Sequence, residues 1–456
     1  MVQRIPTRTW LIGPPADAEW SRRRFLATSA GVLAGAGLVT HDVQANRSTK
    51  RPRVAAIFTS MTYRSHAHVI LENFLEPYLF NGRRTDPGVE VVSFYSDQSP
   101  GGDMAPGVSQ SYNIPIFKTI DAALCLGGKE LAVDAVLSIG EHGSYQSNEL
   151  SQVEYPRKRF FDEIVATMKR SRRFVPVFND KHLSYRWDWA KEMYDTAREL
   201  EIPFLAGSSV PLAERRPPLE LPAGSEIEEA VSIHGGPLES YDFHGLELLQ
   251  SMVESRKGGE TGISRIEFLP GNELLQAAKD GRWSMALAVA AMADELGRKP
   301  DTILRVDGEP EGAPHALLVH YKDGLKATVL CVGQSSTRWN FACRLKGDSE
   351  IRSTAFNAGP WQNRCLFKAL SHAIQHHFVQ RRAPYPVERT LLVTGALEAA
   401  MRARQAVTRQ CDTPHLEFAY APSDFHAMRE MGASWKIITE QMPQPDGIHK
   451  LGNNDG

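Results

Sequence analysis

The stretch FNDKHLSYRWDWAKEMYDTARELEIPFLAG, residues 178–207, places a lysine between a buried strand and a helix. Its first residues complete the apolar run RFVPVFND (173–180), and its last residues lie in a second apolar run, IPFLAGSS (202–209). Between them, apolar side chains recur at helical spacing from Trp187 to Leu200, which predicts a helix with one buried face. This strand–helix–strand unit puts Lys181 at the carboxyl end of its strand, where open parallel sheets bind ligands.

The same alternation of short apolar runs and helical segments begins at Arg53. The strand candidates before residue 173 are RVAAIF (53–58), VEVVSFYSD (89–97), IPIF (114–117) and AVDAVLSIG (132–140). Helical patterns separate most of them, as in a parallel sheet covered by helices. The sequence therefore predicts an α/β fold whose first domain, residues 46–210, is a Rossmann-like doubly wound sheet.

After residue 210 the pattern changes to longer strands. HALLVHYKDGLKATVLCVG (315–333) contains Asp323-Gly324 between apolar alternations, which is a hairpin signature. We expect an α+β domain over 211–425 with an open, mostly antiparallel sheet and helices on one face, and a C-terminal tail over 426–456 that is frayed from Pro443 onward. An exposed sheet face would favour a homo-oligomer.

Length and composition limit the class of protein. A chain of 456 residues suits two domains, and 42% hydrophobic with 23% charged residues is typical of a soluble globular protein. The formal charge of -2 includes no long block of one sign, so no nucleic-acid partner is expected. The five cysteines show no CxxC pair, which argues against a disulfide framework and a structural zinc finger.

The N-terminus has the features of an export signal. SRRRFLATSAGVLAGAGLVTHDVQA (21–45) combines consecutive arginines, a Gly/Ala-rich apolar run and a small-residue site. The apolar run is shorter than the roughly 20 residues of a membrane-spanning helix. We therefore predict a twin-arginine signal peptide over 1–45, a mature chain that begins near Asn46 without a membrane anchor, and a periplasmic or secreted location.

With a lysine after its fifth strand and an open α/β domain behind it, the chain resembles the Gfo/Idh/MocA oxidoreductase family over residues 53–422. Asp180-Lys181-His182 stands where that family has Glu-Lys-Pro. The resemblance implies NAD(P)-dependent oxidation or reduction of a sugar, polyol or related hydroxy compound. It also implies that Lys181, with Asp180 beside it, is catalytic and orients the reacting hydroxyl, where an ammonium group can stabilise a developing alkoxide.

The family's second signature is an aspartate four positions before a histidine on a helix of the second domain. Here His244 stands at the histidine position, which implies a general base. Ser240 replaces the aspartate, and Asp242 or Glu239 is a nearby substitute. Because Asp242 is only two positions from His244, the two do not share a helix face.

The expected cofactor is NAD or NADP, although the phosphate loop departs from the usual pattern. FTSMTYRSHAH (58–68) contains no glycine, whereas a dinucleotide site normally needs GxGxxG after its first strand. Hydroxyl groups and an arginine would have to replace the bare backbone, and an aspartate at the end of the second strand would bind ribose. The predicted cofactor-binding residues are Thr59, Ser60, Thr62, Arg64, Asp97 and Glu141.

The remaining polar residues near the same sheet edge are candidates for substrate contact: His142, His182 and Asp242. Histidines at this edge also raise the question of a metal, but no short ligand motif unites them, so no metal is predicted. Two alternatives to a dehydrogenase stay open. One is a redox-neutral lyase, isomerase or glycosidase-like enzyme that uses bound nicotinamide, and the other is a non-catalytic carbohydrate-binding protein that has lost the cofactor site.

Overall fold

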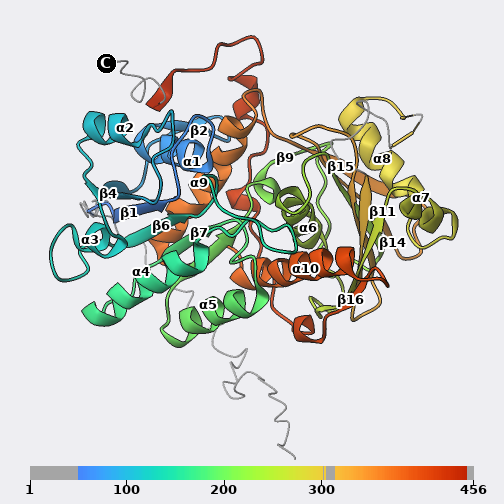
Figure 1. Ribbon diagram of the computed structural model, residues 1–456. Helices are drawn as coiled ribbons and strands as arrows, with labels where there is room; N and C mark the ends of the chain where they lie inside the picture. Colours follow the sequence, from blue (N-terminus) through green and yellow to red (C-terminus); the bar gives the residue numbers. More distant parts are fainter. Residues whose placement is uncertain (1–49, 301, 304–313, 449–456) are drawn as a thin grey trace, which may run out of the picture. The chain divides into compact units, whose positions relative to one another are not determined.

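The computed structural model describes residues 50–300, 302–303 and 314–448. The predicted signal peptide lies outside these ranges. Within them, no helix combines the length and the apolar character needed to cross a membrane. Two large sheets, each with its own helices, make up the described chain (Figure 1).

The first sheet is parallel throughout, with strand order β5-β4-β1-β6-β7-β8. Its strands carry continuous apolar runs because both faces are covered. Apolar residues of one face pack against α1 and α2, and those of the other face pack against α3, α4 and α5. The strands are β1 (Arg53–Phe58), β4 (Glu90–Ser96), β5 (Ile116–Phe117), β6 (Ala135–Ile139), β7 (Val177–Asp180) and β8 (Phe204–Gly207), and the helices are α1 (His66–Leu75), α2 (Ala105–Tyr112), α3 (Ile120–Cys125), α4 (Arg157–Ser171) and α5 (Trp187–Glu199). The doubly wound prediction is confirmed.

The second sheet has eight strands in the order β16-β11-β12-β13-β10-β14-β15-β9. All neighbours are antiparallel except β10 and β13, which pair in parallel. A mostly antiparallel second sheet is thus confirmed as well. Its strands are β9 (Glu214–Arg216), β10 (Ile227–His234), β11 (Ile263–Pro270), β12 (His315–Tyr321), β13 (Lys326–Cys331), β14 (Trp339–Leu345), β15 (Ile351–Asn357) and β16 (Gln410–Asp412). A separate hairpin joins β2 (Tyr78–Phe80) and β3 (Arg83–Thr85).

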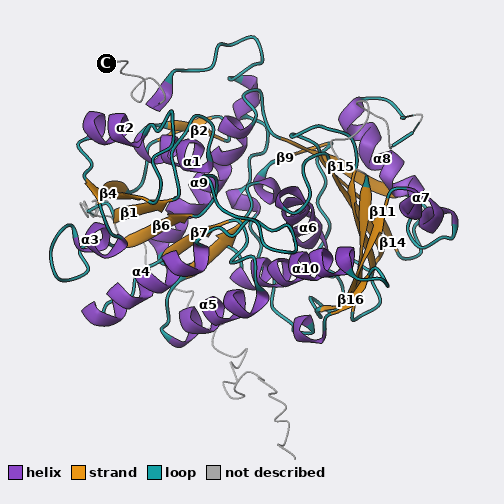
Figure 2. Ribbon diagram, viewed as in Figure 1, coloured by secondary structure: helices purple, strands orange, loops and turns teal. Residues whose placement is uncertain are grey.

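Helices cover both faces of the second sheet, which corrects the expectation of helices on one face only. α6 (Ser240–Val253) and α10 (Val387–Gln405) pack on one side, and α7 (Asn272–Lys279) with α8 (Met285–Leu296) on the other (Figure 2). The apolar side chains of alternate strand positions fill both layers, for example Ala230 on one side and Val231 on the other. The face that we expected to drive self-association is therefore covered by the chain's own α8.

α9 (Asn363–Gln380) returns to the first sheet and packs beside α1. Phe367 and Phe378 of this helix belong to the same core as Val54 of β1. His377 of the same helix is fully buried, and His372 stacks on Phe80. The expected boundary at residue 210 falls between the strands of the two sheets. It does not divide the two hydrophobic cores, because α9 follows the boundary in the sequence and packs into the core of the first sheet.

The C-terminal segment is packed rather than frayed. Met428 and Ile448 join the core of the first sheet, and Glu430 accepts hydrogen bonds from Asn81 and Ser434. Four short 3₁₀ helices complete the described chain: η1 (Val210–Leu212), η2 (Pro414–Leu416), η3 (His426–Met428) and η4 (Ser434–Lys436). The prediction of a frayed tail is therefore wrong up to residue 448.

Candidate active site

The carboxyl ends of β1, β6 and β7 face the first turn of α6 and the start of β14 across a cavity of about 540 Å³. Aromatic and charged side chains from both parts of the chain line it. Those used below are Arg64, His66, Glu141, His142, Lys181, Glu239, Tyr241, His244 and Trp339. A wider pocket of about 850 Å³ lies at α5 and α10, and its described lining includes none of the predicted site residues.

Lys181 follows β7 directly and is 4% exposed. Its backbone has φ 62°, a left-handed conformation that is costly for a residue with a β-carbon. The Lys181 amide donates to the carbonyl of Gly207, and Nζ donates to Oε1 of Glu141 at 2.8 Å. The surrounding contacts thus hold the ammonium group at the cavity wall, as the sequence predicted for its position.

Glu141 lies between two cations. Its second carboxylate oxygen accepts a hydrogen bond from Arg157, which is fully buried at the start of α4. Burial alone raises the pKa of the Glu141 carboxyl, but the charges of Lys181 and Arg157 outweigh that effect and hold the pKa well below its usual value. Glu141 is therefore an anion that neutralises the lysine.

A histidine pair occupies the next part of the wall. His66, the first residue of α1, contacts the Asp180 carboxylate through Nδ1 at 2.6 Å, so Asp180 lies behind the histidine. The ring of His142 meets that of His66 edge to face at 5.1 Å. Nε2 of His142 is buried and has no hydrogen-bond partner among the described residues. Burial, and then His66, lower the pKa of His142 to about 4, which leaves this imidazole neutral at pH 7.

His244 is on the second turn of α6. Its Nδ1 lies 2.5 Å from Oγ of Ser208, a residue next to the end of β8. Burial, and then Lys181, lower the pKa of His244 well below its usual value. The ring is therefore neutral, as a general base requires, and the Ser208 hydroxyl holds its orientation through Nδ1.

Glu239, which the sequence offered only as a nearby substitute for the family's aspartate, lines the cavity. It caps α6, with the Glu239 and Asp242 side chains each accepting from the other's backbone amide. Oε1 of Glu239 is buried, and within the described ranges no hydrogen-bond donor reaches it. Burial, and then the charge of Glu141, raise the pKa of Glu239 to about 7. An acidic side chain three residues before Asp242, at the expected start of the helix, was the available sequence signal.

Two predicted substrate contacts lie behind the wall instead. His182 accepts from Nη1 of Arg157 at 3.2 Å, and its Nδ1 contacts the carbonyl of Ser184. Asp242 is fully buried between α6 and the second sheet, with His234 and His315 against its carboxylate. Neither residue belongs to the described lining of the cavity.

The loop after β1 uses most of its polar groups internally. The amide of Thr62 donates to Oγ of Ser65, and that of Arg64 donates to Nδ1 of His68. Thr59 and Ser60 are buried, and Thr59 donates its hydroxyl to the carbonyl of Glu141. The Arg64 guanidinium donates to Gln362 and to Gln444. These contacts occupy amides and side chains that a phosphate cradle would need.

The polar side chains that follow β4 are also engaged in hydrogen bonds within the chain. Asp97 accepts from the hydroxyls of Tyr95 and Tyr145 at 2.7 Å each, and from Arg159. Burial alone raises the pKa of Asp97, but these donors outweigh it and lower the pKa. Gln98 makes two hydrogen bonds to the backbone of Ser144, so the loop after β6 is tied to the loop after β4.

A dinucleotide in the usual position does not fit these residues. Its adenosine and pyrophosphate would cross the ends of β1 and β4, where the side chains are already engaged. Among the described residues that line the cavity, Thr59, Ser60 and Asp97 are absent. The cavity instead begins at Arg64 and His66 and extends toward the second sheet.

No protein-family model matches the sequence, and a search of curated proteins gave no match either. Solved structures do match. GenD2 from gentamicin A biosynthesis, solved in complex with NAD, aligns with a TM-score of 0.51 and 12% identity over 84% of this chain and 99% of GenD2. An apo scyllo-inositol dehydrogenase from Lactobacillus casei aligns at 0.48 and 9%, over 80% of this chain and 98% of that enzyme.

The likeness to GenD2 supports the predicted fold, a Rossmann-like parallel sheet followed by a mostly antiparallel second sheet. GenD2 was solved with NAD bound, whereas in this chain hydrogen bonds between Gln98 and Ser144 and between Asp97 and Tyr145 join the loops at the adenosine end.

Proposed function

We propose that this chain is an enzyme that acts on a hydroxyl-bearing carbon of a sugar, polyol or related compound. The observation that carries the proposal is the convergence of Lys181 and His244 on one cavity, with Glu141 beside the lysine. Tyr241 and Trp339 stack at 5.0 Å on the opposite wall. Aromatic faces with a few fixed polar groups are what a polyhydroxylated ligand needs for orientation.

Lys181 would hold the substrate oxygen and stabilise negative charge on it, and neutral His244 would accept the hydroxyl proton. The ammonium is oriented before substrate arrives, because Glu141 and the Gly207 carbonyl position the residue. Release from Glu141 is not required, since an ammonium group has three donors. Glu141 in turn stays fixed by Arg157.

The first form of this function is an NAD(P)-dependent oxidoreductase. The fold supports it, since GenD2 was solved in complex with NAD. NAD or NADP would supply the hydride acceptor or donor in such a reaction. Because the usual cradle is filled by the chain's own contacts, this form requires the loops that carry Gln98 and Ser144 to separate.

The second form is a redox-neutral lyase, isomerase or glycosidase-like enzyme, and the carboxyl pair Glu239 and Glu141 favours it. With its pKa raised to about 7, Glu239 holds a proton near neutrality, while Glu141 is ionised. Two acidic groups whose environments separate their pKa values are suited to act as acid and base. This form needs no exchange of electrons with the protein's surroundings.

One experiment separates the two forms. The purified full-length protein is unfolded and the released small molecules are analysed by mass spectrometry, and melting temperatures are measured with and without NAD and NADP. Released nicotinamide, or a melting shift of several degrees with NAD or NADP, shows a bound cofactor, which both forms can use. Net formation of NADH or NADPH with a member of a sugar and polyol panel then supports the oxidoreductase, whereas a product of unchanged oxidation level without such a net change supports the redox-neutral form.

The same panel tests the site itself. Lys181→Met is expected to remove the melting shift that a sugar or polyol produces, whereas Lys191→Met, on the exposed side of α5, leaves it unchanged. A full shift in the Lys181 variant would remove the residue from the site. Absence of any shift from sugars and nicotinamides alike would favour neither enzyme and contradict the proposal.

Export by the twin-arginine pathway is a further part of the proposal. The signal falls on residues 1–45, outside the described residues, and its support is the sequence from Ser21 to Ala45. A fusion of residues 1–50 to a reporter that requires prefolded export is expected to reach the periplasm. Replacing Arg22 and Arg23 by lysine should retain the reporter in the cytoplasm, and export of that variant would exclude this pathway.

A further inference from the structure

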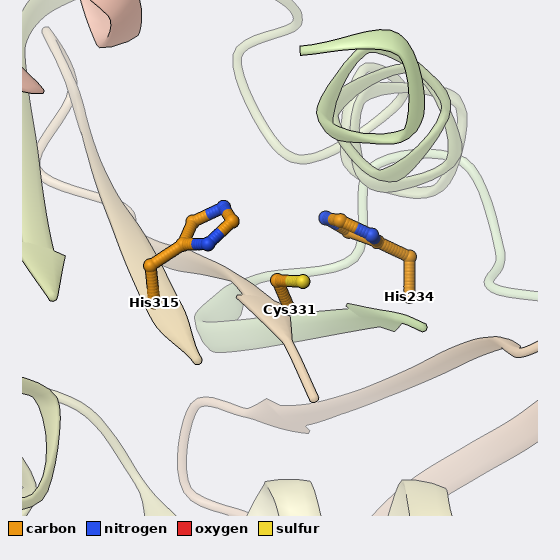
Figure 3. Close-up of side chains that lie close together, drawn as sticks. All are labelled: His234, His315 and Cys331. Atoms are coloured by element: carbon orange, nitrogen blue, oxygen red, sulfur yellow. The ribbon is translucent and has the colours of Figure 1, made fainter. Parts of the chain in front are cut away.

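Three potential metal ligands form a row across the second sheet. His315 of β12 pairs with Cys331 of β13, and Cys331 pairs with His234 of β10. Residues that pair on adjacent strands extend their side chains to the same face. Figure 3 shows the result, with the two imidazole rings turned toward one another and the sulfur of Cys331 between them.

These side chains are close and shielded from solvent. One ligand atom of each of the three lies within 4.8 Å of the others, and all three residues are buried. Cys331 is a free thiol. Nδ1 of His234 has no hydrogen-bond partner among the residues that the structure describes, although the residue is fully buried. A buried imidazole nitrogen without a partner is unusual and calls for an explanation.

The helix above the row offers a fourth candidate ligand, Asp242, which contacts both histidines. Oδ1 of Asp242, in the first turn of α6, lies 3.0 Å from Nε2 of His234 and 2.8 Å from Nε2 of His315. Ligand atoms on a tetrahedral zinc ion with bonds of about 2.0–2.1 Å are separated by about 3.3 Å. The carboxylate oxygen lies closer to each nitrogen than ligands on one ion would, at hydrogen-bond distance, so an ion would replace these two hydrogen bonds and requires rotation of the side chains.

We propose that His234, His315, Cys331 and Asp242 form a closed transition-metal site, with zinc as the expected ion. Two imidazoles, a thiolate and a carboxylate match the nitrogen, sulfur and oxygen ligands that zinc takes in tetrahedral sites. Because four protein ligands leave no open position, the ion would be structural. Binding would displace the thiol proton of Cys331 and the proton shared between Asp242 and the histidines.

The site would bear on the cavity through α6. Asp242 shares the first turn of that helix with Glu239, whose amide donates to Oδ2 of Asp242 at 2.8 Å. Glu239, Tyr241 and His244 line the cavity from the same helix end. A metal ion bonded to Asp242 and to strands of the second sheet would therefore hold one wall of the cavity in place, whichever reaction occurs there.

A metal-free network is the competing explanation. Burial lowers the pKa of His315, but the Asp242 carboxylate outweighs it and raises that pKa to about 10, so an imidazolium can neutralise the buried aspartate. In that state the Cys331 thiol donates to the carbonyl of Gly236. The two states contain the same residues and differ in one measurable quantity, which is bound metal.

The first test is the metal content of the full-length protein after production in a medium supplemented with zinc and purification without chelators. About one zinc per chain is expected, with loss of zinc and a lower melting temperature after treatment with a strong chelator under mildly destabilising conditions. Less than about a tenth of an equivalent of any transition metal would overturn the proposal and leave the proton-linked network.

Variants then locate the ion. Cys331→Ala and His315→Ala are each expected to reduce bound zinc at least tenfold. Cys343→Ala, a buried cysteine on neighbouring β14, and His320→Ala, on the same strand as His315, should keep one equivalent. Retention of zinc in both ligand variants would place the metal elsewhere and contradict the assignment.

A spectroscopic signature keeps the proposal testable if a ligand variant folds poorly. Protein produced with cobalt in place of zinc should show the intense visible bands of a tetrahedral site and a sulfur-to-cobalt charge-transfer band. Cys343→Ala should preserve the charge-transfer band, because that thiol is not a ligand. Cobalt protein without such a band in the unaltered chain would show that Cys331 does not bind the metal.

Discussion

Nζ of Lys181 lies 2.8 Å from Oε1 of Glu141, and the side chains of both residues are buried at the cavity wall. The charge of the lysine is thus already balanced by a neighbour that is itself held by Arg157. Such a cluster orients its members but adds little net stability, because burial of each charge costs about as much as the pairing returns. The cluster therefore positions the Lys181 ammonium group rather than stabilising the fold, as expected for a group that binds or reacts with a substrate.

This pairing predicts strong coupling in a double-mutant cycle. Lys181→Met should lower the free energy of unfolding by about 3 kcal/mol, because the buried Glu141 carboxylate would then be paired with Arg157 but no longer with the lysine. Lys181→Met combined with Glu141→Gln should cost clearly less than the sum of the single changes. Denaturant unfolding of the four proteins at pH 7 provides the measurement, and additive losses would show that the pair is not coupled.

Glu247 of α6 predicts a pH-dependent stability difference. Thr390 has one hydroxyl proton, yet its Oγ1 lies 2.6 Å from Oε1 of Glu247 and 3.1 Å from the carbonyl of Ala206. A protonated Glu247 that donates to Thr390 satisfies both contacts. Burial raises the pKa of Glu247 to about 7, so the folded state retains this proton at pH values where the unfolded state has lost it.

The contribution of Glu247 to stability is therefore complete below about pH 4.5 and falls as the pH rises toward 7. Relative to the unaltered protein, Glu247→Gln should gain up to about 3 kcal/mol of unfolding free energy between pH 4.5 and 7.5. The check is a series of urea titrations across that range. The exposed carboxyl of Glu163 gives the control, and parallel curves for Glu247→Gln and Glu163→Gln would contradict the assignment.

The hydrogen bonds between the loop after β6 and the end of β4, where the adenosine of a dinucleotide would lie, predict that their removal strengthens NAD binding. Gln98→Ala combined with Tyr145→Phe removes two hydrogen bonds from Gln98 and one from Tyr145 that tie the loop after β6 to the end of β4. NAD should therefore raise the melting temperature of this double variant more than that of the unaltered protein. The conservative single change Tyr112→Phe, on α2, serves as a control for loss of a tyrosine hydroxyl. Equal shifts in all three proteins would show that these contacts do not restrict the site.

Gly207 supports Lys181 from the neighbouring strand and should tolerate no side chain. It has φ 132°, and a β-carbon there would lie 2.5 Å from Oε1 of Glu247. Gly224 has φ 82° with open space around the same position, so it carries the backbone strain without the clash. We expect Gly224→Ala to cost about 1 kcal/mol and Gly207→Ala at least about 2 kcal/mol more. Thermal or denaturant unfolding compares them, and similar losses would show that the packing around Gly207 adapts.

The sequence was sufficient for the parts of the fold that depend on local pattern. Alternation of apolar runs and helical segments determined the parallel sheet, and placed Lys181 at the carboxyl end of β7. This works because a buried parallel strand must be apolar throughout and its helix must be apolar on one face. The same local logic predicted helices on only one face of the second sheet, because nothing within a helical segment states which distant face it will cover.

Only the tertiary structure decided how the polar residues are used. The hydroxyls, amides and carboxylate near the ends of β1 and β4 have the chemistry of a cofactor site, yet Asp97 is bound by Tyr145 and Arg159 from distant parts of the chain. His234, Cys331 and His315 are separated by many residues and share a row because three strands align in register. Local sequence sets which groups a residue offers, whereas long-range packing sets which of them remain available, because each buried donor or acceptor must find its partner within the fold.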